Sequence, residues 1–374
     1  MKKDVNKQTI IELCMSPDLG GLELYMAEAA KFLSSCFNVI SIINEKSKLE
    51  EYLVDENYLK VHSKSKFSIY LSAKKIAKII DNNCVELVHI HWTKDLPLAV
   101  LAKLISKRKP KIVQSRHMTM TRFKDDLYHR FLYRQVDMML SVTKQVQEQI
   151  ERFIPNDIRP KVFSLYPGAK VNKFLSENEK ISLKKRLGFN SQGFNIGMVG
   201  RINRDKGQYL LIEAIELLKE RSLNVNAYFV GNAMQDSYLE SLQVNVRNKE
   251  LESNVAFLGF MDAPSDFYQL CDVIVLASKR ETFGLVLVEG MMHKCAVVGA
   301  DTGGVIEIID DKETGLLFKS QDSEDLANKL ELLMRDTLLL DNIRAKGQKK
   351  SLRLFNSQKQ FQALAEIFQN ELVC

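Results

Sequence analysis

The chain has 374 residues, of which 45% are hydrophobic and 27% are charged, and this balance excludes a disordered, collagen-like or fibrous protein. Because a single hydrophobic core stops growing at about 250–300 residues, the length predicts two domains. Lys and Arg outnumber Asp and Glu by 53 to 47, and no apolar run approaches the ~20 residues that a membrane-spanning helix needs.

The first half of the chain alternates short apolar runs with longer segments of helical periodicity. The predicted strands cover residues 9–15, 37–43, 85–91, 111–116, 137–142 and 161–165. The predicted helices between them cover residues 22–33, 69–80, 96–106 and 144–153. Near-continuous apolar strands separated by helices are typical of a parallel sheet that is covered on both faces.

The second half repeats this alternation. Its predicted strands cover residues 194–199, 224–230, 255–258, 273–277 and 296–299, and its predicted helices cover residues 208–221, 236–248, 264–270, 285–293 and 322–335. Pro167 and Gly168 interrupt the pattern. We therefore expect an α/β fold with two tandem doubly wound, Rossmann-like domains, over residues 1–168 and 169–356. A C-terminal helix over residues 357–374 is expected to pack back on the N-terminal domain.

Open parallel sheets bind ligands beyond the carboxyl ends of their strands, so two such domains facing a cleft place the site there. Gly20 and Gly21 follow the first predicted strand and open a helix. Paired glycines allow close approach of the backbone, and a helix N-terminus offers N–H groups to an anion. A tight turn without a ligand is the alternative. The absence of G-x-G-x-x-G here argues against a dinucleotide cofactor.

A second motif, Gly200-Arg201 followed by Lys206-Gly207, lies between the strand over 194–199 and the next helix. A guanidinium and an ammonium at a helix start suit a diphosphate, although either could be a solvated loop residue.

The third motif contains two carboxylates, Glu281 and Glu289, separated by seven residues. The spacing places Glu281 on a loop and Glu289 on the following helix, from which they can reach different parts of an extended ligand. A single Glu at a helix start is otherwise a common capping residue. Gly303 and Gly304 form a further turn after the strand over 296–299.

Three histidines lie at predicted strand ends. His117 follows the strand over 111–116, a position that suits a site residue, although a lone His is more often structural. His89 and His91 share one face of the strand over 85–91 because side chains alternate along a strand. No third ligand lies within sequence reach of them, so we expect no metal site.

Taken together, the E-x7-E pair, the Arg201 and Lys206 loop and the Gly20-Gly21 turn resemble the retaining glycosyltransferases of family 4, which have the two-domain GT-B fold. The resemblance spans essentially the whole chain. It implies an N-terminal domain that binds the acceptor and a C-terminal domain that binds a nucleotide sugar. It implies transfer from a UDP-sugar, or second a GDP-sugar, to a cell-envelope glycan or lipid-linked saccharide, as in bacterial polysaccharide or lipopolysaccharide biosynthesis.

The resemblance also implies roles for single residues. The donor site would contain Gly20, Gly21, Gly200, Arg201, Lys206, Phe260, Glu281, Phe283, Gly284, Leu285 and Glu289, and the catalytic residues would be His117, Glu281, Arg201 and Lys206. Arg201 and Lys206 would neutralise the departing diphosphate, where charge develops as the sugar–phosphate bond breaks. Glu281 would hold sugar hydroxyls and Glu289 the ribose hydroxyls. Phe260 would meet the nucleobase through its backbone, and His117 would lie beside the transferred sugar.

No D-x-D sequence is present, so we expect neither a metal ion nor another cofactor. A nucleotide-sugar epimerase of the same fold and a non-catalytic nucleotide-sugar-binding subunit are the alternatives. Front-face attack and a covalent intermediate both remain open as routes to retention.

The charge is unevenly distributed. Residues 1–170 contain 28 Lys and Arg against 19 Asp and Glu, whereas residues 171–374 contain 25 against 28. A basic first half suits an anionic partner, either nucleic acid or an acidic membrane, although solvated lysines are the simpler explanation. No nucleic-acid-binding signature is present, so we expect no nucleic acid partner. Scattered cysteines and an N-terminal apolar stretch too short for a signal peptide favour the cytoplasm, with possible peripheral binding to the inner face of the cell membrane.

Overall fold

The computed structural model describes residues 7–53, 57–62, 66–190, 192–261 and 264–373, with the side chains of residues 66 and 67 left aside. The chain forms two compact units. Unit 1 contains Met1–Tyr166 together with Lys359–Cys374, and unit 2 contains Pro167–Gln358. The sequence places the corresponding boundaries at 168/169 and 356/357, so the units differ from the expected domains by two residues at each crossing.

Unit 1 is built on a seven-stranded, fully parallel sheet of order β3-β2-β1-β4-β5-β6-β7. Its strands are β1 (Thr9–Cys14), β2 (Asn38–Asn44), β3 (Tyr58–Val61), β4 (Val85–Ile90), β5 (Lys111–Arg116), β6 (Met138–Ser141) and β7 (Lys161–Ser164). The central strand β1 is buried along its whole length, as expected for a sheet covered on both faces.

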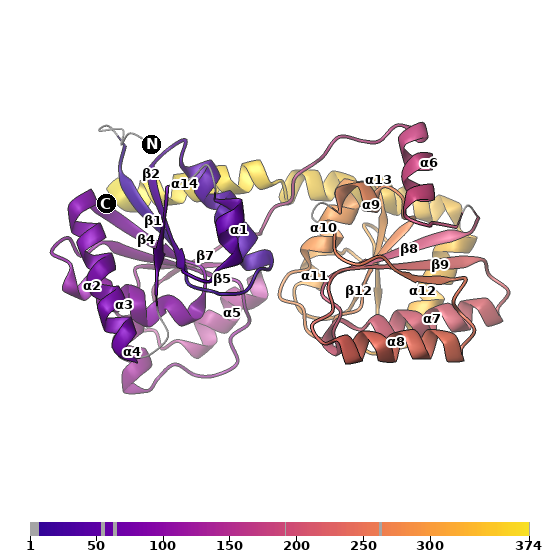
Figure 1. The fold of residues 1–374 in the computed structure, drawn as a ribbon, viewed down its shortest axis with the longest axis horizontal. Helices are drawn as coiled ribbons and strands as arrows, with labels where there is room; N and C mark the ends of the chain where they lie inside the picture. Colours follow the sequence, from indigo (N-terminus) through magenta and orange to yellow (C-terminus); the bar gives the residue numbers. More distant parts are fainter. Residues whose placement is uncertain (1–6, 54–56, 63–65, 191, 262–263, 374) are drawn as a thin grey trace. The chain divides into compact units, whose positions relative to one another are not determined.

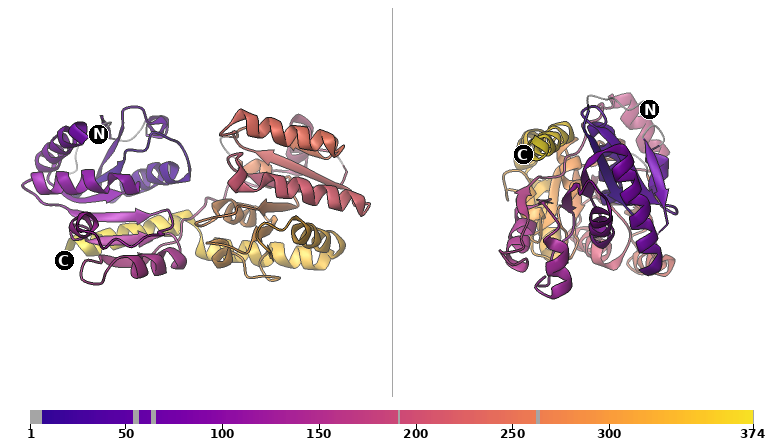
Figure 2. Two further views of the ribbon diagram at one scale, coloured as in Figure 1. Left: turned by 90° about the horizontal axis from the view of Figure 1, so that it is seen from below. Right: turned by 90° about the vertical axis from the view of Figure 1, so that its left-hand side faces the viewer.

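Helices cover both faces of this sheet (Figures 1 and 2). They are α1 (Gly21–Leu33), α2 (Lys66–Asn83), α3 (Leu96–Ile105), α4 (Leu127–Tyr133), α5 (Lys144–Phe153) and α14 (Ser357–Val373), with the short 3-10 helices η1 (Lys48–Tyr52) and η2 (Thr93–Asp95). One apolar core joins α1 and α14 to one face of the sheet, and a second joins α2, α3, α4 and α5 to the other face.

The C-terminal helix α14 completes the first of these cores. Phe361, Leu364 and Phe368 are buried against residues of α1 and of the central strands. The ring of Phe361 lies 5.4 Å from that of Tyr25, and the ring of Phe368 lies 6.4 Å from that of Phe37. In Figure 1 the yellow end of the chain runs among the indigo and purple elements of this unit.

Unit 2 contains a six-stranded parallel sheet of order β10-β9-β8-β11-β12-β13. Its strands are β8 (Phe194–Val199), β9 (Val225–Val230), β10 (Val255–Phe257), β11 (Val273–Leu276), β12 (Ala296–Ala300) and β13 (Leu316–Phe318). Its helices are α6 (Glu177–Arg186), α7 (Gln208–Glu220), α8 (Asp236–Asn248), α9 (Ser265–Tyr268), α10 (Leu285–Met292), α11 (Val305–Ile308), α12 (Ser323–Arg335) and α13 (Thr337–Leu354), with the 3-10 helix η3 (Arg204–Lys206).

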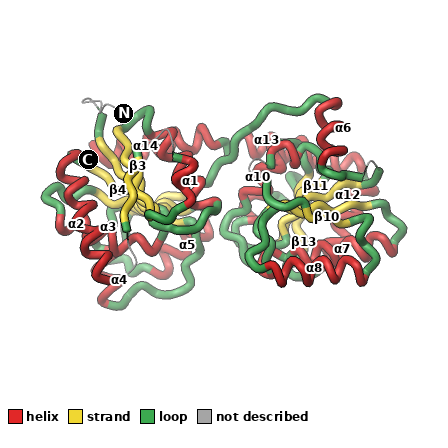
Figure 3. Tube along the Cα trace, in the orientation of Figure 1, coloured by secondary structure: helices red, strands yellow, loops and turns green. Residues whose placement is uncertain are grey.

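The helices of unit 2 also pack on both faces of their sheet, and Figure 3 draws the yellow strands of each unit inside a shell of red helices. One core joins α7, α8 and α12 to the sheet. On the other face α10 packs on β11 and β12, and α13 packs on α10. Both sheets therefore confirm the predicted doubly wound, Rossmann-like architecture.

Among the described elements, six α-helices and strands were not predicted from the sequence: β3, β13, α4, α6, α11 and α13. The strands among them are short, with four residues in β3 and three in β13. Helix α6 is polar all round and buries only Leu183, but a capping box of Ser176 and Glu179 fixes its first turn. Helix α13 buries Leu340, Ile343, Gly347 and Ser351, and it packs most closely at Gly347, where a Cβ would lie 2.9 Å from the carbonyl oxygen of Thr314. Hydrophobic periodicity does not report such a face.

Candidate active site

Each sheet reverses its strand order next to its first strand, and ligands of doubly wound folds bind beyond the carboxyl ends of the strands at that point. In unit 1 the reversal lies between β1 and β4, and in unit 2 it lies between β8 and β11.

In unit 2, the loops that follow β8 and β11 meet. The backbone N–H of Lys279, after β11, donates to the carbonyl oxygen of Asp205, in η3, at 2.8 Å. A Cβ on Gly207 would lie 2.3 Å from the carbonyl oxygen of Ala277, so only glycine permits this approach, and its φ of +78° also favours glycine. The structure therefore brings the second and third predicted motifs together.

An ion pair joins these two motifs. Lys206 Nζ donates to Glu281 Oε2 at 2.8 Å, with side-chain exposures of 27% and 17%. The Asn203 side chain accepts a hydrogen bond from the backbone N–H of Lys206 at 3.1 Å, which fixes the short helix that carries the lysine. Because the pair is only partly buried, Lys206 can exchange Glu281 for a stronger anion without losing all of its hydration.

Arg201, like Arg204, is an exposed cation of the loop that follows β8. Its backbone carbonyl accepts a hydrogen bond from the Gln208 side chain at 3.0 Å, whereas its guanidinium has no partner among the described residues. The fork of N–H donors is therefore available to an external anion.

The fourth predicted motif, the turn of Gly303 and Gly304, contacts the backbone of the loop that carries Glu281. The N–H of Gly304 donates to the carbonyl oxygen of Glu281 at 3.1 Å. A Cβ on Gly303 would lie 1.9 Å from that same oxygen, and a Cβ on Gly304 would lie 2.2 Å from the carbonyl oxygen of Thr282. This glycine turn thus sets the position of the Glu281 loop.

Helix α10 follows that loop and carries Glu289. Gly284, with φ of +104°, precedes the helix, and Leu285 is its half-buried first residue. The Phe283 side chain is buried with its ring 5.6 Å from that of Phe355, so only the backbone of Phe283 can face a ligand. The hydroxyl of Tyr268 donates to Glu289 Oε2 at 2.5 Å. Burial, followed by the charge of Glu289, raises the pKa of Tyr268 well above its ordinary value, so the tyrosine remains a donor.

The carboxyl ends of β8, β9 and β10 are tied by backbone contacts. Gly200 N–H donates to Val230 at 2.9 Å, and Gly231 N–H donates to Gly259 at 2.8 Å. A Cβ on Gly231 would lie 2.0 Å from the carbonyl oxygen of Gly200. Phe260 follows directly and is 55% exposed. The predicted nucleobase residue therefore lies at the same edge of the sheet as Gly200.

In unit 1, Gly20 and Gly21 begin α1 directly after β1. No side chain caps the first turn of this helix, and a Cβ on Gly21 would meet nothing within 4 Å. Glu23 is buried in that turn, and a Cβ on Gly20 would lie 3.3 Å from its carboxylate.

His117 directly follows β5. Its ring lies 4.9 Å from that of Tyr25 and 5.7 Å from that of His91. Its Nε2 is buried without a hydrogen-bond partner among the residues that the structure describes. Burial, and next the charge of His91, lower the pKa of His117 well below its ordinary value, so the ring is neutral near pH 7.

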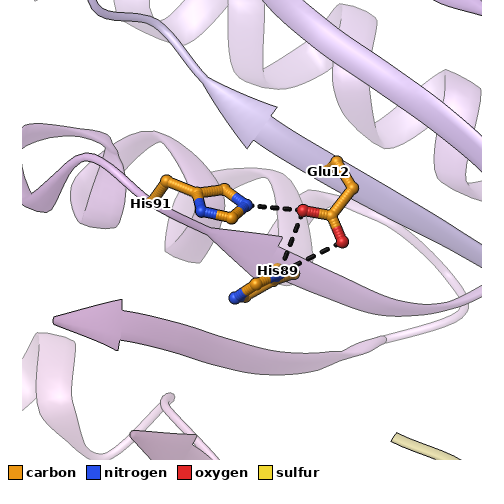
Figure 4. A group of neighbouring side chains, drawn as sticks. All are labelled: Glu12, His89 and His91. Carbon is orange, nitrogen blue, oxygen red and sulfur yellow. Dashed lines mark hydrogen bonds and ion pairs between the residues drawn. The ribbon is translucent and has the colours of Figure 1, made fainter. Parts of the chain in front are cut away.

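A buried cluster beside His117 contains a residue that sequence reasoning missed (Figure 4). Glu12 in β1 lies between His89 and His91, and all three side chains have no exposed surface. Glu12 Oε2 lies 2.9 Å from His89 Nδ1 and 2.5 Å from His91 Nε2. Potential ligand atoms of the three residues lie within 4.8 Å of one another. An isolated acid inside an otherwise apolar strand was the signal available in the sequence.

Two family descriptions match the chain. "Glycosyl transferases group 1" matches residues 179–350, and "Glycosyl transferase 4-like" matches residues 12–146. The chain is a glycosyltransferase with the GT-B fold.

Individual proteins agree with this assignment. EpsD from Bacillus subtilis (strain 168), which carries the name of a glycosyltransferase, is 28% identical over 308 residues, 79% of each chain. The capsular polysaccharide biosynthesis glycosyltransferase CapM from Staphylococcus aureus is 27% identical over 201 residues, 54% of this chain and 52% of CapM. The crystal structure of Anabaena HepE in complex with UDP-glucose has a TM-score of 0.84 at 22% identity, over 97% of this chain and 99% of HepE.

Within the described part of this glycosyltransferase, no helix has both the length and the apolar character to cross a bilayer.

Proposed function

We propose that this glycosyltransferase transfers a sugar from a nucleoside diphosphate sugar, a UDP-sugar before a GDP-sugar, to a cell-envelope glycan or a lipid-linked saccharide. The observation that carries the proposal is the group of Arg201, Lys206 and Glu281 at the strand-order reversal of unit 2. An exposed guanidinium without a partner lies in the same loop as an ammonium paired with a partly buried carboxylate. Two cations and one acid suit a ligand that has both a diphosphate and hydroxyl groups.

The reaction breaks the bond between the anomeric carbon of the donor and a diphosphate oxygen, and it forms a bond from that carbon to an acceptor hydroxyl. The diphosphate leaves with the electron pair, and the acceptor hydroxyl loses its proton. Arg201 and Lys206 stabilise the charge that develops on the diphosphate. When Lys206 turns toward the diphosphate, Glu281 is released to accept hydrogen bonds from sugar hydroxyls.

Glu289, held by Tyr268, accepts hydrogen bonds from the ribose hydroxyls. The backbone of Phe283 and Gly284, which precede α10, borders the diphosphate. The N–H groups of the first turn, which begins at Leu285, also face it, because the first turn of a helix leaves N–H groups without intrahelical partners. We assign Gly200 and the backbone of Phe260 to the nucleobase, Gly20 and Gly21 to the diphosphate, and His117 to a hydroxyl of the transferred sugar.

Support for the donor and the acceptor comes from the relatives. HepE was crystallised with UDP-glucose, and CapM belongs by name to capsular polysaccharide biosynthesis. We extend both features to this chain as part of the proposal. We also place it among the retaining enzymes of family 4, with the E-x7-E pair of Glu281 and Glu289, and propose that Arg201 and Lys206 serve in place of a metal ion.

The experiment is an assay of purified protein with a panel of UDP- and GDP-sugars and with saccharide acceptors. A new glycoside and stoichiometric nucleoside diphosphate support the proposal, and NMR of the product gives its anomeric configuration. Conversion of one nucleotide sugar into another without release of nucleoside diphosphate would identify an epimerase. Binding without any product would identify a non-catalytic subunit.

Peripheral docking on an anionic membrane is the remaining part of the proposal. Five large apolar side chains between β5 and the end of α4 are exposed by 49–87%: Met118, Phe123, Leu127, Tyr128 and Phe131. Two basic clusters of unit 1, over residues 60–66 and 103–109, are expected to contribute to docking. They are partly engaged within the protein, because Lys60 pairs with Glu50 and Lys103 with Asp137. Lys64 and Ser65 lie outside the described residues.

Leu127, 87% exposed at the start of α4, is the sharpest probe of this surface. We expect wild-type protein to sediment with phosphatidylglycerol-containing liposomes at low salt and Leu127→Glu to sediment less, because the variant adds a negative charge where apolar contact is needed. Leu338→Glu, at an 83% exposed leucine of unit 2, is the matched control. Equal sedimentation with neutral and anionic liposomes would contradict docking.

A further inference from the structure

The face of the unit 1 sheet that packs on α1 and α14 has a buried row of polar side chains across its central strands. Ser41, Glu12 and His89 are register partners across β2, β1 and β4. His89 Nε2 continues the row to Ser115 Oγ in β5 at 2.8 Å. Each of these four residues is buried, with at most 3% of its surface exposed. Burial of the Glu12 carboxylate and of the His89 and His91 imidazoles in an apolar core costs folding free energy. We therefore expect these side chains to serve a function.

The protonation of this row follows from its contacts. Burial by itself raises the pKa of Glu12, but the charge and hydrogen bond of His89 and the hydrogen bond of His91 outweigh it and lower the pKa to about 2. An ionised carboxylate only accepts hydrogen bonds, so His89 Nδ1 and His91 Nε2 must both carry protons. Burial, followed by the charge of His89, lowers the pKa of His91 to about 4. His91 is thus a neutral ring, protonated on Nε2, with a lone pair on Nδ1.

This fixed ring supports the predicted catalytic histidine. The rings of His91 and His117 are stacked at 5.7 Å with an interplanar angle of 23°. The ring of Tyr25 lies 4.9 Å from that of His117 and 5.8 Å from that of His91, and Tyr25 is itself held by a hydrogen bond from the Gln360 side chain in α14 at 2.6 Å. His91 Nδ1 and His117 Nε2 are both buried without partners among the described residues. Two unpaired imidazole nitrogens at the strand-order reversal are available to a polar ligand.

We infer that Glu12 is a positioning residue for sugar transfer, which acts through His91 to hold the ring of His117. The inference rests on the proposed function, in which His117 binds the transferred sugar. Glu12 fixes the tautomer and the plane of His91, and the stacked His91 ring fixes the plane of His117. A hydroxyl bound by His117 is then held in the orientation that transfer requires, and a displacement of about 1 Å can cost roughly 100-fold in rate.

The distances from Glu12 to His89 and His91 indicate direct hydrogen bonds rather than shared coordination of a metal ion. Two nitrogen or oxygen ligands about 2.0–2.1 Å from a tetrahedral zinc ion lie roughly 3.3 Å apart. Glu12 lies closer than this to both imidazoles, at 2.5 and 2.9 Å.

The first test measures the protonation of the histidines by NMR and does not depend on enzyme activity. Wild-type protein labelled with ¹⁵N-histidine should show His91 protonated on Nε2 and unprotonated on Nδ1 from pH 5.5 to 8. In Glu12→Gln one histidine must face an amide N–H, so we expect His89 or His91 to change tautomer. The other titratable groups around His91 and His117 are His89, Arg116 and Tyr25, and α14 contributes only uncharged side chains there. A wild-type His91 with a proton on Nδ1, or stoichiometric zinc that is lost in Glu12→Gln, would overturn the network.

The second test measures transfer. We expect Glu12→Gln to lower kcat by about 10- to 100-fold in the wild-type background and to have no further effect in the His117→Ala background, because the two residues act in series. Glu86→Gln, a half-buried carboxylate of β4 bonded to Gln8 at 3.1 Å, is the matched control and should retain wild-type kcat. His91→Phe keeps an aromatic ring next to His117 but loses the hydrogen bond to Glu12. We expect it to lower kcat by the same factor as Glu12→Gln, so it provides a second test if Glu12→Gln folds poorly.

The outcomes distinguish failure of the positioning role of Glu12 from failure of the proposed function. Equal losses from Glu12→Gln in both backgrounds, or a wild-type kcat in Glu12→Gln, would refute the positioning role while leaving the glycosyltransferase proposal intact. Absence of transfer by wild-type protein with every nucleotide sugar would refute the donor assignment. The ¹⁵N spectra would still test the buried network in that case.

Discussion

Replacement of Lys206 by alanine separates the catalytic role of the ion pair from its structural role. Lys206 Nζ lies 2.8 Å from Glu281 Oε2, and the two side chains are 27% and 17% exposed. Partly exposed pairs contribute at most about 1 kcal/mol to folding, so the thermal midpoint should fall by only a few degrees. Loss of a cation that stabilises the departing diphosphate should lower kcat by roughly 10²–10³, equivalent to about 2.7–4 kcal/mol of transition-state stabilisation.

The assay is the initial rate of nucleoside diphosphate release at saturating donor, together with a thermal unfolding curve for each protein. Lys249→Ala is the matched control, because Lys249 pairs with Glu216 in the same unit at similar exposures of 24% and 31%. Both variants should lose similar stability, but only Lys206→Ala should lose turnover. A near-wild-type kcat in Lys206→Ala with the donor saturating would refute the diphosphate assignment. An equal loss of kcat in Lys249→Ala would show that the loss of turnover in Lys206→Ala comes from reduced stability and not from the site.

Four further predictions follow from the same structure. Arg201→Ala should lower kcat by roughly 10²–10³ without a change in thermal midpoint, because its exposed guanidinium has no partner to lose among the described residues; a wild-type rate would exclude it from the site. Gly303→Ala should cost about 1–2 kcal/mol of stability and also lower kcat, because its φ is +60° and the added Cβ would lie 1.9 Å from the carbonyl oxygen of Glu281; urea unfolding and rate measurements check this. Transfer in excess EDTA should equal the untreated rate, and a loss restored by magnesium or manganese would contradict a reaction without metal. Acid should destabilise the protein in two steps: the lowered pKa of His91, about 4 against an ordinary 6.5, makes stability fall as pH drops from 6.5 to 4, and the lowered pKa of Glu12, about 2 against 4.5, extends the loss toward pH 2. Denaturation curves at pH 3–7 should show a weaker acid dependence in Glu12→Gln.

Much of the fold could be predicted because buried parallel strands are apolar throughout. Strands such as β1 and β9, buried along their whole length, are evident from composition alone. Loops that follow such strands must meet at one edge, which is why the Lys206 and Glu281 motifs could be expected near each other before their ion pair was seen. The polar helix α6 could not be recognised by hydrophobic periodicity, because its capping contacts define it.

The Glu12 cluster shows the other limit of sequence reasoning. His89 and His91 were correctly placed on one face of a strand, and no third partner was found near them in sequence. Glu12 is 77 residues from His89. It becomes a neighbour only because β1 lies between β2 and β4, and strand order depends on how the whole unit packs rather than on any local pattern.

The division of unit 1 between the two ends of the chain bears on how the protein folds during synthesis. Phe361, Leu364 and Phe368 of α14 complete the core over α1, so residues 7–166 alone would leave that apolar face uncovered. Unit 2 is continuous and can close as soon as its own residues have left the ribosome. At about 5–20 residues per second, the 208 residues that follow Tyr166 take roughly 10–40 s to translate. The N-terminal unit, although first to be made, is therefore the last to be finished, and during that interval its exposed core is a target for chaperones and for aggregation.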